Sequence, residues 1–167
     1  MTGPTFPLAQ FAHRGATLQG RFDIMLENHP EEVWAALTRP AEFIKWLAPG
    51  VIDARPGGRV ILDFEASGIV VDSAVTSYER MRMLEYSWSG PGEPLRPIRW
   101  ELEPIGAATR LLLSITIPDN EDVGRACAGW AAHLEMLIAT LAGLSASFPR
   151  GLFTAAREFY EVEVAAL

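Results

Sequence analysis

The chain has 167 residues, of which 49% are hydrophobic and 21% charged, and its net charge is −7. These values predict one folded domain with a substantial core and exclude a disordered chain. The negative balance argues against a surface for nucleic acid or for an anionic membrane. The single cysteine allows no internal disulfide, and no segment has the pattern of a signal peptide or a membrane span, so we expect a cytoplasmic protein.

The N-terminal third predicts an arm, a strand and two helices. Residues 1–16 lack periodicity and are expected to form a loose arm. Residues 17–26 alternate between apolar and polar side chains, which predicts a half-buried strand. Pro30 then precedes two glutamates and an apolar stripe, an order typical of a helix start, and predicts a helix over 30–38. Pro40 ends it, and a shorter helix is expected over 41–46.

The middle of the chain predicts an antiparallel meander. Short apolar segments alternate with turns that contain proline and glycine. Short connections of this kind join antiparallel neighbours. The six expected strands cover residues 51–55, 59–65, 69–78, 83–89, 96–103 and 109–117.

A long helix over 126–143 is the most strongly predicted element. It is rich in Ala, Leu and Met, contains no proline, and reaches a glycine stop at Gly143. Its apolar residues recur at helical spacing, so one wide face is expected to pack on the sheet. Residues 144–167 follow as a helical extension, with an amphipathic helix over 152–167. We expect this extension to pack on its own domain, with a contact in a homodimer as the alternative.

The sequence resembles the heat-shock ATPase activator homologue family of the START-like (SRPBCC) superfamily, which has the birch-pollen-allergen fold. The resemblance covers residues 17–143 and is carried by ordered fragments: Pro30–Pro40, Trp46, Pro56-Gly57-Gly58, Arg82–Trp88, Gly129-Trp130, His133-Leu134 and Leu137. It implies an α+β helix-grip fold, in which a curved antiparallel sheet wraps around the long C-terminal helix and leaves an apolar cavity. Arg39 departs from the acidic residue usual in the family, and the extension lies outside the shared core.

The candidate ligand-binding residues are large side chains on predicted inward faces. Five tryptophans are many for a chain of this length, and rigid rings suit the wall of an apolar pocket, although ordinary core packing is the first interpretation of each residue. The predicted site consists of Trp34, Phe43, Trp46, Phe64, Trp88, Trp100, Trp130, His133 and Leu137. His133 lies on or beside the apolar helix face, either as a satisfied core group or as a polar anchor for a ligand.

Other reactive groups give weaker patterns. The histidines at positions 13, 29 and 133 lack metal-ligand spacing, so we expect no metal and no cofactor. Cys127 has no activating partner in sequence and is interpreted as a buried apolar residue. Asp72 interrupts an apolar strand and is either a solvated carboxylate or a cavity acid paired with Arg59 or Arg99. No phosphate-binding loop or nucleophile elbow is present.

These patterns favour a protein that binds a small hydrophobic or aromatic molecule in an internal cavity. A cavity-based enzyme, such as an aromatic cyclase or hydrolase, is the first alternative. A polar cluster that joins His133 to Asp72, Tyr86 or Arg99 would favour it. A cofactor of a chaperone ATPase, or another interaction role, is the second alternative. No catalytic residue is identified, and the identity of the ligand does not follow from the sequence.

Overall fold

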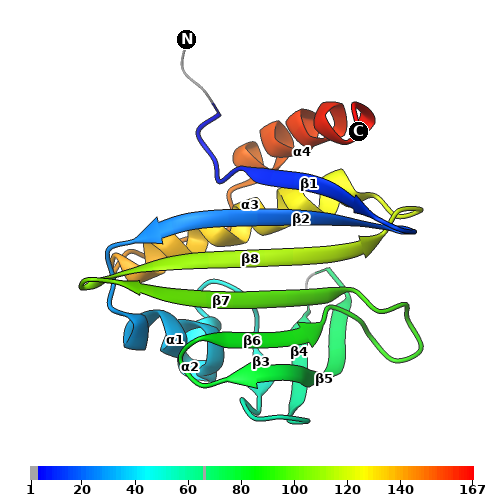
Figure 1. Cartoon of the computed structure of the whole chain (residues 1–167). Coiled ribbons are helices and arrows are strands. Elements are labelled where there is room, and N and C mark those ends of the chain that lie inside the picture. The colour runs from blue at the N-terminus through cyan, green and yellow to red at the C-terminus, as the bar shows by residue number, and fades with distance from the viewer. Residues whose placement is uncertain (1–3, 66) are drawn as a thin grey trace.

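One open antiparallel sheet forms the body of the protein in the computed structural model, which describes residues 4–65 and 67–167. Its eight strands lie in the order β1-β2-β8-β7-β6-β5-β4-β3 (Figure 1). The pairing of β2 with β8 brings an early and a late strand together at residues Thr17 and Pro118. The strands are β1 Ala9–Arg14, β2 Thr17–Leu26, β3 Gly50–Ile52, β4 Arg59–Phe64, β5 Ile69–Glu79, β6 Met83–Ser87, β7 Pro97–Ile105 and β8 Ala108–Pro118.

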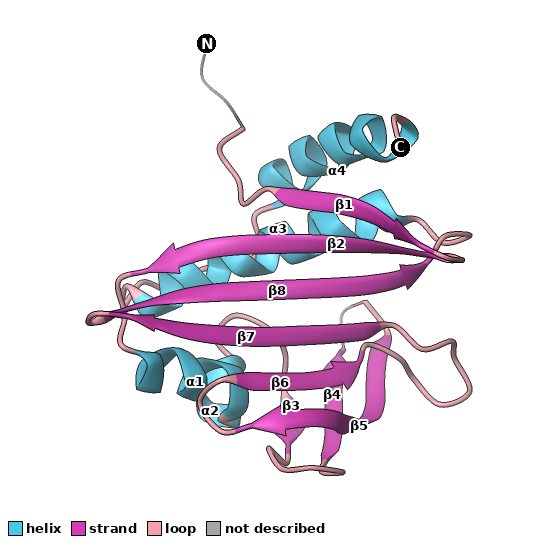
Figure 2. Cartoon of the chain, viewed as in Figure 1, coloured by secondary structure: helices cyan, strands magenta, loops and turns pink. Residues whose placement is uncertain are grey.

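Four helices complete the described part of the chain: α1 Pro30–Thr38, α2 Pro40–Phe43, α3 Val123–Leu141 and α4 Arg150–Ala165. The long helix α3 crosses behind β2 and β8, and α4 lies against α3 beside β1 (Figure 2). The two short helices lie between β2 and β3 in the chain, and α1 contacts α3, β7 and β8. This arrangement is the α+β helix-grip fold that the sequence predicts, with a curved sheet around a long C-terminal helix.

The core lies between the sheet and α3 because both present an apolar face. In β8, every second residue from Thr109 to Ile117 is buried, as the alternation of the sequence predicts. The facing residues of α3 are spaced as one stripe of a helix, and Cys127, Trp130, Leu134 and Leu137 are all buried. The Cys127 side chain packs directly on the β2 backbone at Gly20, where a Cβ would lie 2.7 Å from its sulfur.

Several predicted boundaries move by a few residues. Helix α3 begins at Val123 instead of residue 126, because the Asp122 side chain accepts a hydrogen bond of 3.0 Å from the Arg125 amide and caps the helix. The predicted stop is confirmed, since Gly143 adopts a φ of 78° directly after the C-cap. Strand β3 ends at Ile52 because the chain turns at Asp53, whose carbonyl accepts a hydrogen bond from the Arg55 amide.

The expected loose arm is the clearest correction to the predicted elements. Residues 9–14 form β1, an edge strand that pairs with β2 from Ala9 opposite Phe22 to Arg14 opposite Thr17. The sequence does not reveal this strand because most of its side chains are exposed, so no alternation of apolar residues marks it. Its only large apolar anchor is Phe11, which packs edge-on against Tyr160 at 5.5 Å between ring centroids.

The C-terminal extension packs on its own domain, as the sequence predicts. Ala156 and Tyr160 of α4 are fully buried. The Tyr160 hydroxyl donates a hydrogen bond of 2.7 Å to the Pro7 carbonyl and accepts one of 3.2 Å from the Ala9 amide. Phe6 adds an edge contact to the same ring at 5.9 Å. Residues Phe6, Pro7 and Ala9 therefore bind α4, which packs against α3. Among the described helices, none has the length and apolar character needed to cross a membrane.

Candidate functional site

A continuous series of aromatic rings connects the buried core to the surface between α3 and the sheet. Its successive ring centroids lie 4.8–5.9 Å apart and most pairs meet edge-to-face, the geometry that aromatic pairs prefer. The inner end is 1% exposed and the outer end 39% exposed. We call this series the aromatic cluster; it consists, from inside to outside, of Trp46, Trp100, Trp130, Trp88, Phe64, His133 and Phe148.

Six different parts of the fold contribute to the aromatic cluster. Trp46 follows α2, and its indole N–H donates a hydrogen bond of 2.9 Å to the Ala36 carbonyl, which fixes the ring in the core. Trp100 comes from β7, and Phe64 ends β4. Trp130 and His133 lie one turn apart on α3, so both face the sheet. Trp88 follows β6, and Phe148 lies in the connector from α3 to α4.

His133 is the polar group of the aromatic cluster. Its Nδ1 lies 2.9 Å from the Trp46 carbonyl oxygen. A carbonyl oxygen only accepts hydrogen bonds, so this contact requires the proton on Nδ1 in the neutral ring. Burial lowers the pKa of His133 below its ordinary value, and the hydrogen bond to Trp46 opposes that shift in part. The imidazole is therefore neutral at pH 7, with a lone pair on Nε2.

The predicted site residues do not all belong to this place. Trp46, Phe64, Trp88, Trp100, Trp130 and His133 are brought together. Trp34 is 8% exposed and packs against Tyr78 at 6.0 Å, apart from the ring contacts of the cluster. Phe43 and Leu137 are fully buried apolar residues; Phe43 has no ring contact with the cluster among the described aromatic pairs, and Leu137 has no ring. The inward-facing pattern thus identified residues of one hydrophobic core, of which only some take part in the series of ring contacts.

Phe148 is the site residue that the sequence analysis missed. Its ring lies 5.5 Å from His133 and 5.7 Å from Phe153 on α4, so it closes the outer end of the aromatic cluster. The segment Phe148-Pro149-Arg150-Gly151 has the composition of a connector, and no periodicity marks its phenylalanine. Leu144 is also a large apolar residue of this connector, so residue type alone does not distinguish Phe148.

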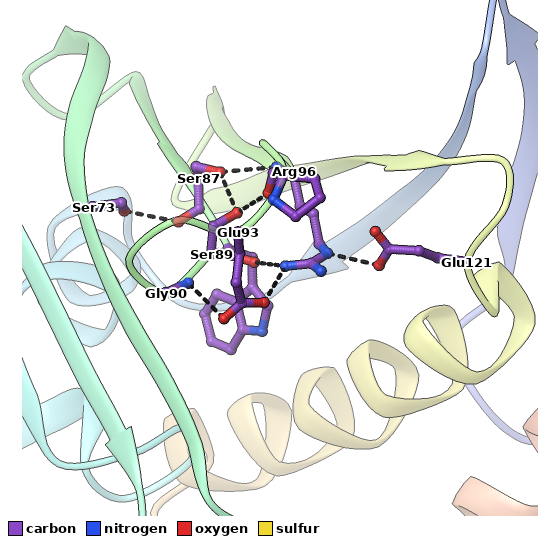
Figure 3. A network of polar contacts seen from close by, with 9 residues as sticks. Ser73, Ser87, Ser89, Gly90, Glu93, Arg96 and Glu121 are labelled. Carbon is purple, nitrogen blue, oxygen red and sulfur yellow. Dashed lines mark hydrogen bonds and ion pairs between the residues drawn. The ribbon is translucent and has the colours of Figure 1, made fainter.

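A polar network fixes the loop that carries Trp88. Arg96 donates hydrogen bonds to Glu121 (2.7 Å), Glu93 (2.9 Å) and the Trp88 carbonyl (3.3 Å), and so connects this loop to the segment that precedes α3 (Figure 3). The buried hydroxyls of Ser87 and Ser89 lie 2.8 Å apart, and the Arg96 amide donates to Ser87 over 2.8 Å. These contacts set the position of Trp88 beside α3. Sequence reasoning missed this network because the alternation within a strand does not report that polar groups of Ser87, Arg96 and Glu121, from different segments, meet in the fold.

The remaining candidates are structural or solvated groups. Asp72 pairs with Arg59 at 3.2 Å in a solvated position, whereas Arg99 binds Glu85 at 2.8 Å. Cys127 is fully buried, and burial raises the pKa of its thiol to about 12, which leaves it unreactive at neutral pH. The described residues contain no group of three His, Cys, Asp or Glu side chains that would hold a metal ion.

Two shallow surface depressions of the described structure lie away from the aromatic cluster. One lies on the outer side of α4, beside Val162 and Ala165. The other lies among Leu8, Arg21, Arg110 and Phe159, where β1, β2 and β8 meet α4. Neither touches a residue of the aromatic cluster, whose rings fill the space between α3 and the sheet. The internal cavity expected from the family resemblance stays a prediction.

The fold and the aromatic cluster define a helix-grip protein of the START-like kind. Residues 28–142 match the family model described as "Activator of Hsp90 ATPase homolog 1-like protein", so the chain belongs to this family. This confirms the resemblance inferred from the sequence. No curated protein matches the chain.

Solved structures extend the same fold over most of the chain. CalU16 from Micromonospora echinospora is 20% identical, with a TM-score of 0.78 over 96% of this chain and 98% of its own. The protein encoded by gene BPP1335 from Bordetella parapertussis is 30% identical, with a TM-score of 0.68 over 96% and 94%. DynU16, a protein of the dynemicin biosynthetic locus, is 26% identical with a TM-score of 0.68, over 76% of this chain and 48% of its own.

Proposed function

We propose that the protein binds a small aromatic molecule between α3 and the sheet, at the outer half of the aromatic cluster. The main support is that the cluster extends from the core to the surface and contains one polar ring, His133, among apolar rings. Binding sites for such ligands are mostly apolar, with few polar groups that set orientation. The occurrence of DynU16 in a biosynthetic locus supports a ligand that is a biosynthetic product or intermediate.

Ligand access requires the Phe148 ring to move. Phe148 is 39% exposed and makes an edge contact to His133 and a tilted contact to Phe153, each worth about 0.5–1.5 kcal/mol. Burying roughly 150 Å² of ligand ring gains about 4 kcal/mol at about 25 cal/mol per Å². The gain exceeds the cost of releasing the two contacts. Most residues from 142 to 148 are exposed, so few packing contacts of the connector oppose this movement.

Tryptophan fluorescence tests the proposal directly. We expect polycyclic aromatics, flavonoids or aromatic polyketides to quench the emission, and Trp88→Phe to weaken both the quenching and the affinity. Trp34→Phe is the matched control, since the ring contact of Trp34 among the described pairs is with Tyr78 and not with the aromatic cluster. Phe148→Ala should speed association, whereas Leu144→Ala, at an exposed position in the same connector, should not. If no aromatic compound binds the folded protein, or if Trp34→Phe weakens binding as much as Trp88→Phe, the proposed site is wrong.

The described contacts provide no specific support for the two alternatives, a cavity-based enzyme and a chaperone cofactor. The hydrogen bond of His133 goes to the Trp46 carbonyl, and Arg99 binds Glu85, so the described contacts do not join His133 to Asp72, Tyr86 or Arg99 as an enzyme site would. The family description refers to a chaperone ATPase activator. A chaperone cofactor role stays a prediction that a pull-down of such an ATPase with altered turnover would support.

A further inference from the structure

In the neutral ring of His133, Nδ1 makes a hydrogen bond within the protein, whereas Nε2 has a free lone pair. Nδ1 must donate its proton to the Trp46 carbonyl, 2.9 Å away, because that oxygen only accepts. Among the described residues, no group donates a hydrogen bond to Nε2. The backbone geometry of Trp46 and α3 thus sets the tautomer, and the tautomer makes Nε2 an acceptor.

The surroundings of His133 are aromatic and uncharged. Its ring neighbours are Phe64 at 5.7 Å, Phe148 at 5.5 Å and Trp130 at 6.2 Å. None of these side chains offers a hydrogen-bond acceptor or a positive charge, and only the indole of Trp130 carries a donor. A hydroxyl that enters between these rings would meet one matching partner, whereas a carboxylate would meet a lone pair and no cation.

We propose that His133 Nε2 selects aromatic ligands that carry a hydroxyl, by accepting the hydrogen bond of that hydroxyl. This inference rests on the proposed function, since it concerns the same site. It specifies the ligand class further: phenols are preferred over their methyl ethers, over the unsubstituted ring and over aromatic carboxylates. The preference arises because leaving the Nε2 lone pair buried against an apolar group forfeits the hydrogen bond it makes with water.

Four naphthalene probes test this selection: 2-naphthol, 2-methoxynaphthalene, naphthalene and 2-naphthoate. We expect the wild-type protein at pH 7.5 to bind 2-naphthol about tenfold more tightly than 2-methoxynaphthalene, as one additional hydrogen bond implies. We expect 2-naphthoate to bind most weakly. In His133→Phe, which keeps a planar ring, naphthalene should still bind, while the preference for 2-naphthol should disappear. Trp34→Phe should retain the preference.

The tautomer of His133 can also be measured in the wild-type protein, so this test does not depend on His133→Phe being folded. Long-range proton–nitrogen NMR spectra distinguish a protonated from an unprotonated imidazole nitrogen. We expect His133 to show a protonated Nδ1 and a bare Nε2, and 2-naphthol to shift the Nε2 signal. If the probes bind equally well, or if Nε2 carries the proton, the selection is refuted while the aromatic site stands. If none of the four binds to the wild type, the proposed function is refuted and the selection with it.

Discussion

Removing one oxygen atom from Tyr160 tests how the C-terminal extension is held. The Tyr160 hydroxyl makes two hydrogen bonds, to the Pro7 carbonyl and from the Ala9 amide. Tyr160→Phe leaves both backbone groups without this partner. A typical intramolecular hydrogen bond contributes about 0.5–1.5 kcal/mol, and Pro7 and Ala9 are only half-buried, so water replaces part of the loss. We expect the free energy of unfolding to fall by about 1–2 kcal/mol.

For a chain of this length, that loss lowers Tm by roughly 3–6 °C. Urea unfolding followed by circular dichroism measures the free energy, and hydrogen exchange of the Ala9 amide gives a local readout that should speed up by about tenfold or more. Tyr78→Phe is the matched control. It removes the same atom from a half-buried ring whose hydroxyl has no hydrogen bond within the described residues. If Tyr160→Phe stays within about 0.3 kcal/mol of wild type, or if Tyr78→Phe loses as much, the reasoning is refuted.

Three further predictions concern His133, Arg96 and the extension. Burial lowers the pKa of His133 in the folded state, so the unfolded chain takes up the proton at a higher pH than the folded protein does. The free energy of unfolding should therefore fall as pH drops from about 7 through 6.5 to the folded pKa. Between the two pKa values, the slope should be about 1.4 kcal/mol per pH unit. Urea titrations should show this slope in wild type and in His13→Gln but not in His133→Gln; the carboxylates of Asp23 and Glu93, whose hydrogen bonds with Arg110 and Arg96 lower their pKa values, lose their contribution only at more acidic pH. Arg96→Leu should lower the free energy of unfolding by about 1–2 kcal/mol in thermal unfolding, since it breaks the contacts to Glu121, Glu93 and the Trp88 carbonyl. Arg99→Leu is the control, because Arg99 is more exposed in its pair with Glu85. If Arg96→Leu loses no more than Arg99→Leu, the role of the network is contradicted. Deletion of residues 148–167 should lower Tm while light scattering gives an unchanged mass; a halved mass would instead show that the extension forms a dimer contact, and an unchanged Tm would show that its packing contributes nothing.

The sequence predicts an element well where burial repeats along it. In β8, apolar residues alternate from Leu111 to Ile117, and in α3 they recur every three or four residues, so both faces were predictable. The strand β1 lacks such a pattern because it lies at the sheet edge and exposes most of its side chains. Only the pairing with β2, a tertiary contact, defines it.

The sequence predicted most residues of the aromatic cluster as inward-facing, but it did not predict which of them contact one another. The same inward-facing pattern marks Trp34 and Trp130, yet one packs on Tyr78 and the other joins the aromatic cluster. Periodicity reports which side of an element a residue faces and carries no information on its partner across the core. Phe148 lies in a connector without a period, and Arg96 lies at the start of a predicted strand, where the alternation does not identify the partner of its side chain. Their importance depends on contacts with His133 and Glu121, which only the folded chain brings together.

The indole N–H signals of the five tryptophans offer the most direct test of the proposed binding site. They are observed together in one proton–nitrogen correlation spectrum. Trp88 and Trp130 lie in the middle of the cluster, against Phe64 and His133 of its outer half, and Trp34 lies beside Tyr78. On titration with 2-naphthol, we expect the signals of Trp88 and Trp130 to shift strongly and saturably, while that of Trp34 stays nearly unchanged. A saturable titration that leaves Trp88 and Trp130 in place, or that moves Trp34 most, would contradict binding between α3 and the sheet.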